Sequence, residues 1–128
     1  MSTTNAPIPH PPITLPDDAG FETICTHYAE SPQLHGGGAV PPIYQNSTFV
    51  FPTLESYERR FEPEFRRCDY TRTGNPTTAI LEAKVARLEN GTWGRAFGSG
   101  MGAISAAINA CVHSGSHVVC VAHCYGCT

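Results

Sequence analysis

Residues 75–91, with the sequence NPTTAILEAKVARLENG, decide how the ordered part of this chain begins to fold. Asn75 is a favoured residue for capping the start of a helix, and Pro76 suits the first helical position. Gly91 supplies a stop. Between them, apolar side chains recur at helical spacing: Leu81, Val85 and Leu88. The stretch therefore predicts a helix that starts at residue 76.

The segments that follow alternate between strand and helix patterns. Residues 94–97 form a short strand candidate, and Ser99 to His113 is typical of a second helix, which Gly115 breaks. Residues 117–121 are a β-branched run of the buried-strand type. This order predicts an α/β fold with a parallel sheet. Two strands and two helices cannot cover both faces of such a sheet, so the fold looks interrupted in its middle.

The first 74 residues differ from the rest in composition and in the scarcity of periodic apolar patterns. Residues 1–20 are rich in Pro, Thr and Asp, which predicts a disordered or extended tail. Residues 21–74 contain few periodic segments, with one short helix expected at about 53–61. Such irregular chain cannot build its own core, so we interpret it as an N-terminal arm that packs on something else, such as another subunit. Residues 75–128 form the start of an α/β domain.

Composition and charge exclude several classes of partner. The formal charge is −3 and there is no basic run, which argues against nucleic acid or an anionic membrane as partner. No apolar stretch approaches the roughly 20 residues needed to span a bilayer. Residues 1–18 lack the cationic start and apolar centre of a secretory signal. We therefore expect a cytoplasmic protein with reduced thiols.

The glycine-bracketed turn Gly98-Ser99-Gly100-Met101 is a candidate phosphate site. A small-residue turn that opens a helix presents free N–H groups at the positive end of the helix dipole. The alternative is a tight strand-to-helix connection whose glycines serve only packing. The turn by itself does not distinguish between these two interpretations.

Three further side chains fit the same kind of ligand. Tyr70 and Arg72 are alternate residues of an apparently extended segment, so both can reach one phosphate. Tyr125 follows the second predicted strand, at the sheet edge where α/β proteins bind ligands, and its ring could stack on a flat cofactor. Each is more often a plain surface or packing residue. Together they suggest pyridoxal 5′-phosphate (PLP).

A cluster of cysteines and histidines near residue 128 permits another interpretation. Cys124 and Cys127 have zinc-like or redox-like spacing, and Cys120, His117 and His123 lie close by in the sequence. No second Cys-x-x-Cys pair completes a set of four ligands, so we expect no metal site. A small metal- or redox-active thiol protein remains the alternative.

Taken in order, these motifs resemble the Cys/Met-metabolism PLP-dependent enzymes, the family of cystathionine γ-synthase, cystathionine γ-lyase and methionine γ-lyase. The resemblance starts near Phe21 and is carried by several segments in register: Gly38-Ala39-Val40-Pro41-Pro42-Ile43-Tyr44-Gln45, Ser47-Thr48-Phe49, Tyr70-Thr71-Arg72, Asn75-Pro76-Thr77, Leu81-Glu82, Leu88-Glu89, Ser99-Gly100-Met101 and Tyr125-Gly126-Cys127-Thr128. It implies a fold-type-I, aminotransferase-like architecture, with residues 75–128 as the start of the large PLP-binding domain.

The resemblance also implies residue roles. Gly100 and Met101 would donate backbone N–H groups to the PLP phosphate, and Tyr125 would stack on the pyridine ring and act in catalysis. Tyr70 and Arg72 would reach the phosphate bound in a neighbouring subunit. Family members are usually homotetramers built from such active-site dimers.

The resemblance implies transsulfuration chemistry, a lyase or transferase reaction of cysteine and methionine metabolism. It covers γ-elimination or γ-replacement on methionine, cystathionine or O-acylhomoserine. Two features favour methionine γ-lyase: Cys127, which would lie near the substrate, and the amino-acid sequence of the Ser99–Ile104 segment. Thr71 and the Ala122-His123-Cys124 segment depart from the family pattern, and the second departure leaves the substrate open.

The chain has a single lysine, Lys84, inside the first predicted helix. PLP chemistry needs a lysine Schiff base, and in the family that lysine lies beyond the position matching residue 128. We therefore expect an N-terminal fragment that is inactive alone. A non-catalytic piece that docks on a homologous subunit is the other interpretation.

Overall fold

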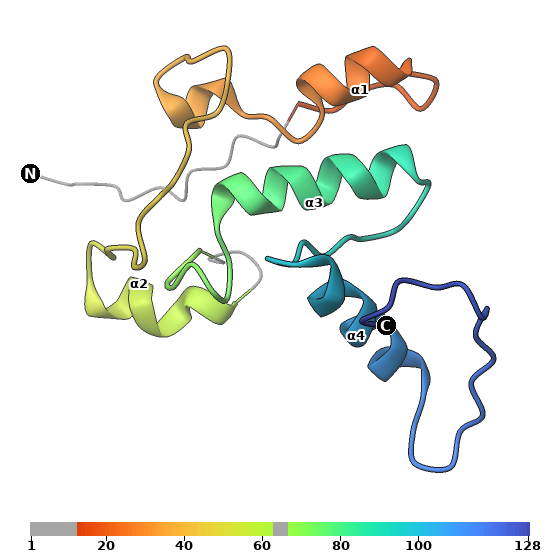
Figure 1. Ribbon diagram of the computed structural model, residues 1–128. Coiled ribbons are helices and arrows are strands. Elements are labelled where there is room, and N and C mark those ends of the chain that lie inside the picture. Colours follow the sequence, from red (N-terminus) through yellow and green to blue (C-terminus); the bar gives the residue numbers. More distant parts are fainter. Residues whose placement is uncertain (1–12, 63–66) are drawn as a thin grey trace, which may run out of the picture. The chain divides into compact units, whose positions relative to one another are not determined.

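The computed structural model describes residues 13–62 and 67–128, so most of the predicted tail at residues 1–20 lies outside the described residues. The chain divides into two compact units, Met1–Gly94 and Arg95–Thr128, which are considered separately. The helical elements follow one another along the chain (Figure 1): α1 (Phe21–His27), η1 (Pro32–His35), α2 (Leu54–Glu58), η2 (Arg59–Phe61), α3 (Pro76–Leu88) and α4 (Gly100–Cys111).

Helix α3 begins where the sequence predicts. The Asn75 side chain accepts a hydrogen bond from the Thr77 N–H at 2.9 Å, and Pro76 occupies the first turn. The same Asn75 amide donates to the Tyr44 carbonyl at 2.9 Å and to the Thr71 hydroxyl at 3.1 Å. With only 4% of its surface exposed, Asn75 joins the arm to the start of α3.

Helix α3 ends differently from the prediction. The residue in the left-handed region is Asn90, with φ of 54°, and Gly91 is not among the positive-φ glycines. The N–H of Gly91 reaches the Ala86 carbonyl at 2.7 Å and so satisfies one of the last free carbonyls. Asn adopts this conformation more easily than other residues with a side chain, which explains why the stop falls one residue earlier.

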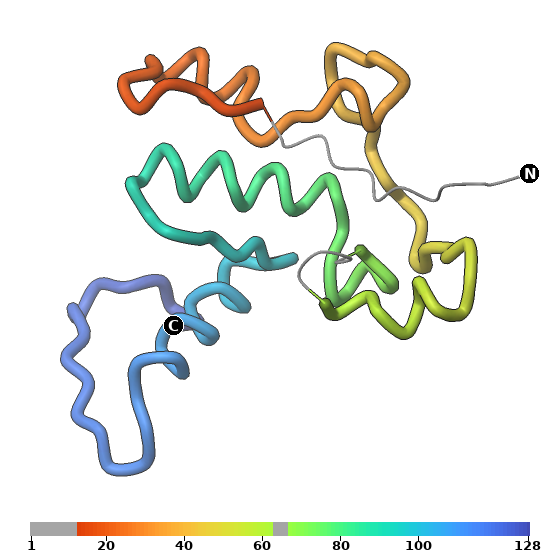
Figure 2. Tube along the Cα trace, turned by 180° about the vertical axis from the view of Figure 1, so that it is seen from behind, coloured from red at the N-terminus to blue at the C-terminus, as the bar shows by residue number. Residues whose placement is uncertain are grey.

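Helix α1 packs against α3, as Figures 1 and 2 both show. Among the described residues, the buried apolar side chains are Ile24 of α1 and Ala86 of α3. The apolar face that predicted α3 is not the packed one, because Leu81 and Val85 are exposed. Neither α1 nor η1 was predicted. A helix of seven residues has little stability in isolation and depends on such packing.

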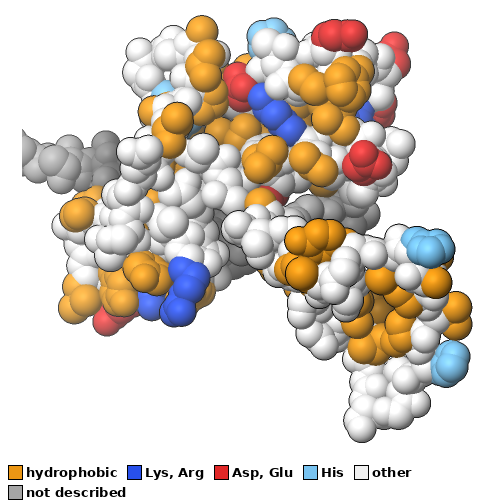
Figure 3. Space-filling view, viewed as in Figure 1, with side chains coloured by type: hydrophobic (Ala, Val, Ile, Leu, Met, Phe, Trp, Pro, Cys, Tyr) orange, Lys and Arg blue, Asp and Glu red, His pale blue; other side chains and the backbone are white. Residues whose placement is uncertain are grey.

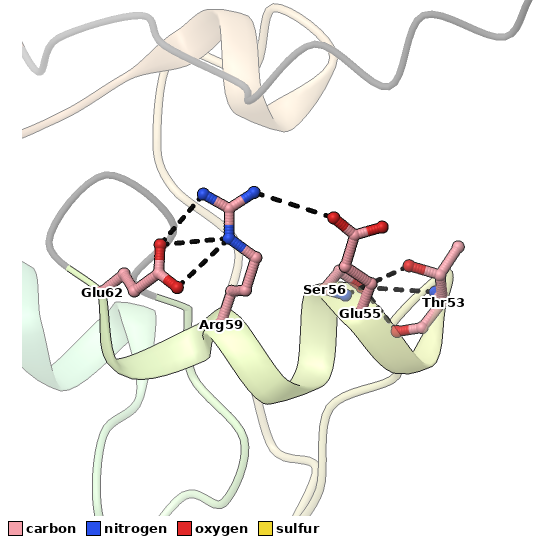
Figure 4. Close-up of polar contacts among 5 residues, drawn as sticks. All are labelled: Thr53, Glu55, Ser56, Arg59 and Glu62. Carbon is pink, nitrogen blue, oxygen red and sulfur yellow. Dashed lines mark hydrogen bonds and ion pairs between the residues drawn. The ribbon is translucent and has the colours of Figure 1, made fainter.

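The short helix expected at about 53–61 is confirmed as α2 followed by η2. Thr53 and Ser56 form a capping box, in which each side chain accepts from the other residue's backbone N–H, at 3.1 and 3.2 Å (Figure 4). Arg59 then pairs with Glu62 at 3.0 Å and with Glu55 at 3.9 Å. Local sequence therefore accounts for this element.

Helix α4 confirms the second predicted helix, although it ends at Cys111 rather than near His113. The two predicted strands are absent from the residues that the structure describes, where an isolated Thr48–Tyr70 bridge is the β pairing present. Residues 94–97 and 117–121 carry no strand pairing, and Val119 is 87% exposed. The described residues of this chain therefore form helices without the predicted parallel sheet. A parallel strand exists only through hydrogen bonds to neighbouring strands, and these segments have none here.

Within the described residues, no helix has both the length and the apolar content required to cross a bilayer.

Replacing Asn75 by Ala tests the link between arm and helix. We expect the free energy of unfolding of the first unit to fall by about 1–3 kcal/mol, because the Tyr44 carbonyl and the Thr77 N–H lose their partner. Urea titration followed by far-UV circular dichroism measures the change. Asn75→Ser is the matched control: its hydroxyl can still cap the helix but both amide donors are lost, so an intermediate loss is expected. An unchanged urea midpoint in Asn75→Ala contradicts this role.

Candidate cofactor-binding site

The start of α4 carries exposed backbone donors. Ser99 caps the helix, and its Oγ accepts a hydrogen bond from the Gly102 N–H at 3.1 Å. Among the described residues, the N–H groups of Gly100 and Met101 find no hydrogen-bond partner. Because the positive end of the helix dipole lies at these groups, they are able to bind an anion.

The turn before α4 leaves room for such an anion. A Cβ atom added to Gly98 or to Gly100 would meet no atom within 4 Å, so the backbone there faces open space. At Gly102, by contrast, a Cβ would approach the Ser99 Oγ to 3.1 Å. Two free donors beside open space fit the phosphate of PLP.

The end of the second unit returns to this helix start. The Thr128 hydroxyl lies 3.9 Å from the Met101 sulfur, and the Thr128 N–H donates to the Tyr125 carbonyl at 2.8 Å. The resulting tight turn contains Cys127 and leaves Tyr125 67% exposed. Figures 1 and 2 show this C-terminal end beside α4. The predicted site residues of the second unit, Gly100, Met101, Tyr125 and Cys127, thus belong to segments that meet.

Tyr70 and Arg72 lie close together, but for a different reason from the one predicted. Residues 71–73 form a turn rather than an extended segment, and the Thr73 and Gly74 N–H groups both donate to the Tyr70 carbonyl, at 2.9 and 3.0 Å. The turn brings the Arg72 guanidinium carbon to 5.6 Å from the centre of the Tyr70 ring. Both residues belong to the first unit.

Asp69 organises this turn, and sequence reasoning missed it. Its Oδ1 accepts from the Thr73 hydroxyl and from the Tyr70 N–H, both at 2.8 Å, and Arg60 lies 3.3 Å from its Oδ2. The Thr73 hydrogen bond is the main cause that lowers the pKa of Asp69 below its ordinary value, with Tyr70 and Arg60 adding to it. The carboxylate form is therefore favoured. An Asp that starts a turn and is followed by Thr four residues later is the signal that could have found it.

A groove of about 620 Å³ borders Tyr70 in the first unit and was not predicted. Aromatic rings form much of its wall, and Phe51 and Tyr57 meet edge to face at 5.3 Å. Its lining residues are Thr48, Phe49, Phe51, Thr53, Leu54, Tyr57, Asp69 and Tyr70. The sequence pattern that could have indicated this groove is the alternation of Phe49 and Phe51, which places both rings on one side of an extended segment.

The cysteine and histidine cluster does not form a metal centre in the part of the chain that the structure describes. There, no three side chains of the His, Cys, Asp or Glu type are grouped so as to hold a metal ion.

Comparison with known proteins identifies the family. The model of the family described as Cys/Met metabolism PLP-dependent enzyme matches residues 22–128. The chain belongs to this family. Enzymes of this family depend on PLP as cofactor.

Relatives of known activity are similar over most of this chain. The L-methionine gamma-lyase of Pseudomonas putida is 44% identical over 109 residues, which is 85% of this chain and 27% of the relative. That of Fusobacterium nucleatum subsp. nucleatum is 46% identical over 110 residues, 86% of this chain and 28% of the relative. The O-acetyl-L-homoserine sulfhydrylase of Corynebacterium glutamicum is 38% identical over 110 residues, 86% of this chain and 25% of the relative. The chain thus spans about a quarter of their length.

Because PLP-dependent enzymes hold their cofactor through a lysine, the surroundings of Lys84 matter. Its Nζ lies 2.6 Å from a carboxylate oxygen of Glu30 and donates to the carbonyls of Cys25 at 2.7 Å and Thr26 at 3.4 Å. These contacts use all three ammonium donors and place the charge at the C-terminal end of α1. Lys84 thus acts as a clamp between α1 and α3.

Replacing Lys84 by Met tests the clamp. The Lys84 and Glu30 side chains are 16% and 8% exposed. The variant should therefore lose about 2 kcal/mol of unfolding free energy, a value between those for breaking an exposed and a buried ion pair. Urea titration followed by circular dichroism measures it.

The double variant Lys84→Met with Glu30→Gln is the control, because it leaves no unpaired buried charge. It should recover part of the loss. A single variant as stable as the unchanged chain refutes the clamp.

Proposed function

We propose that this chain is part of a PLP-dependent enzyme of fold type I that eliminates or replaces the γ-substituent of a sulfur-containing amino acid. The observation that carries the proposal is the pair of N–H groups of Gly100 and Met101 at the start of α4, which have no hydrogen-bond partner among residues 13–62 and 67–128. Membership of the Cys/Met metabolism PLP-dependent family supports it. In this proposal the two groups bind the cofactor phosphate.

Tyr125 is the proposed catalytic residue. It is exposed, and its turn is tied to Met101 through Thr128. An aromatic ring near the phosphate donors can stack on the pyridine ring, and a phenol can hold or move a proton at the substrate or its leaving group. When bound, PLP supplies the electron sink for the reaction.

Tyr70 and Arg72 are proposed to bind the phosphate of a cofactor held by a neighbouring subunit. The turn built on Asp69 holds the phenol and the guanidinium side by side, and both residues are exposed. A hydroxyl donor beside a guanidinium fork suits a phosphate dianion. The enzyme would then be a homo-oligomer, with dimers sharing active sites.

Methionine is the proposed first substrate. Relatives that are 43–46% identical are L-methionine gamma-lyases, whereas the sulfhydrylase and a cystathionine gamma-synthase are 38% and 39% identical. Cys127, two residues after Tyr125, is proposed to lie near the substrate sulfur. Elimination is therefore favoured over replacement.

The chain of 128 residues is expected to be inactive alone. Incubated with PLP and L-methionine, it should release no thiol. Borohydride reduction and mass spectrometry should find no phosphopyridoxyl group on Lys84 in the folded chain, because Glu30 and two carbonyls engage its ammonium group. Unfolding in urea frees Lys84 and should allow its labelling, which is the internal control. Thiol release by the folded chain contradicts this expectation.

A chimaera tests the phosphate site. Residues 22–128 replace the matching segment of the Pseudomonas putida L-methionine gamma-lyase, and we expect a protein that retains PLP and releases thiol from methionine. Gly100→Pro removes one N–H donor at a position where Pro suits the helix. It should weaken PLP retention by about 10- to 100-fold, the value of a hydrogen bond to a charged group.

Two controls separate the roles in the chimaera. Asn109→Ala, near the far end of α4, should leave PLP retention unchanged. Tyr125→Phe should lower kcat by about 100-fold or more while PLP stays bound, because only the phenol proton is lost. Full PLP retention in Gly100→Pro refutes the phosphate site.

A further inference from the structure

Two neighbouring arginines of η2 have partners of different kinds. Arg59 pairs with residues close to it in the chain, Glu62 at 3.0 Å and Glu55 at 3.9 Å (Figure 4). Arg60 reaches a residue nine positions away, because its Nε donates to the Asp69 Oδ2 at 3.3 Å. Arg60 therefore links η2 to a separate segment of the first unit.

Several contacts fix the Arg60 guanidinium at once. One of its terminal nitrogens donates to the Tyr57 carbonyl at 2.7 Å. Its Cζ lies 3.8 Å from the centre of the Tyr57 ring and 4.2 Å from the centre of the Phe61 ring. A guanidinium is a rigid planar fork that stacks on aromatic rings, and this side chain is 17% exposed. These contacts hold the guanidinium in place with its Nε at Asp69.

Asp69 transmits this constraint to the turn that follows it. Its other oxygen, Oδ1, accepts from the Tyr70 N–H at 2.8 Å and lies 2.8 Å from the Thr73 hydroxyl. The Tyr70 carbonyl in turn accepts from the N–H groups of Thr73 and Gly74. Because Arg60 engages one oxygen and the turn engages the other, the carboxylate fixes the turn relative to η2.

We propose that Arg60 is a positioning residue for phosphate binding, because it fixes through Asp69 the turn that carries the phosphate donors. These donors are Tyr70 and Arg72, so the inference rests on the proposed function. Arg60 itself has no need to reach the phosphate, since its charge is paired with Asp69. It acts by reducing the cost of ordering the donors when the phosphate binds.

The first measurement requires no cofactor. In the full chain, amide hydrogen exchange of Tyr70, Thr73 and Gly74 reports how firmly the turn is held, because their N–H groups donate within it. Arg60→Met keeps an unbranched apolar stem and removes the link. It should speed exchange of these amides by about fivefold or more, measured by nuclear magnetic resonance.

The adjacent arginine supplies the matched control. Arg59→Met removes the same charge from the same short helix and leaves the pair of Arg60 with Asp69 in place. It should leave the exchange rates of the turn within about twofold of those of the unchanged chain.

The second measurement is the dissociation constant of PLP from the chimaera with the Pseudomonas putida L-methionine gamma-lyase. Arg72→Met removes a proposed phosphate ligand and should raise this constant by about 10- to 100-fold. Arg60→Met should raise it by about tenfold, the cost of ordering one side chain on binding. Arg60→Lys keeps the positive charge and should recover part of that loss. Arg59→Met should leave the constant unchanged.

A double-variant cycle shows whether Arg60 acts through Asp69. Asp69→Asn keeps an oxygen for the Tyr70 N–H but leaves Arg60 without its carboxylate. In that background, Arg60→Met should change the PLP dissociation constant by less than about twofold, because the link is already broken. If Arg60 only stabilised η2 by stacking on aromatic rings, the two effects would add.

Three results overturn this inference and leave the proposed function intact. They are unchanged hydrogen exchange in Arg60→Met, unchanged PLP binding in Arg60→Met where Arg72→Met binds weakly, and additive effects in the cycle. Full PLP binding by Arg72→Met is a different result, because it removes the proposed role of Arg72 and this inference with it. The two failures are therefore distinguishable.

Discussion

A single buried amide, that of Asn75, connects the parts of the first unit. Its oxygen accepts from the Thr77 N–H and so caps α3. Its nitrogen donates to the Tyr44 carbonyl of the arm and to the Thr71 hydroxyl in the turn that follows Tyr70. A buried amide must satisfy both its donors and its acceptor, so these three segments can pack only in a mutually compatible way. The placement of Tyr70 and Arg72 next to α3 depends on this constraint.

The candidate phosphate-binding groups of the two units arise from local geometry of different kinds. In the second unit, a helix start leaves two N–H groups unpartnered, and a terminal turn returns to Met101. In the first unit, a carboxylate bends the chain so that a phenol and a guanidinium meet. Each unit, taken by itself, offers donors to an anion, which agrees with a family whose cofactor carries a phosphate.

Exposed apolar surface characterises the described residues. Figure 3 shows hydrophobic side chains at the surface over both parts of the chain. Examples are Leu81 and Val85 of α3 and Ile104 and Ile108 of α4. The apolar residues of α3 and α4 nevertheless recur at helical spacing, because this periodicity depends only on residues close in sequence. Which face becomes buried is a separate matter, and it depends on what lies against the helix.

The site was predictable where it rests on short-range patterns. The helix that starts at Ser99 follows from neighbouring residues. So does the proximity of Tyr70 to Arg72, although a turn causes it and not the extended segment that was predicted. The aromatic groove beside Tyr70 was missed because its lining comes from separate segments, whereas Asp69 was missed although its main partners, Tyr70 and Thr73, are close in sequence. The Lys84 clamp joins residues 54 positions apart in sequence, a separation that periodicity cannot detect.

By itself, the sequence determined the helix starts at Asn75 and Ser99, the short helix at about 53–61 and the family resemblance, since caps and motifs act over a few residues. The tertiary structure alone decided that α1 forms against α3, that the packed side of α3 carries Ala86 and Lys84 rather than Leu81 and Val85, and that residues 117–121 stay unpaired. A short helix and a strand both draw their stability from distant partners, and no local pattern states whether those partners are present.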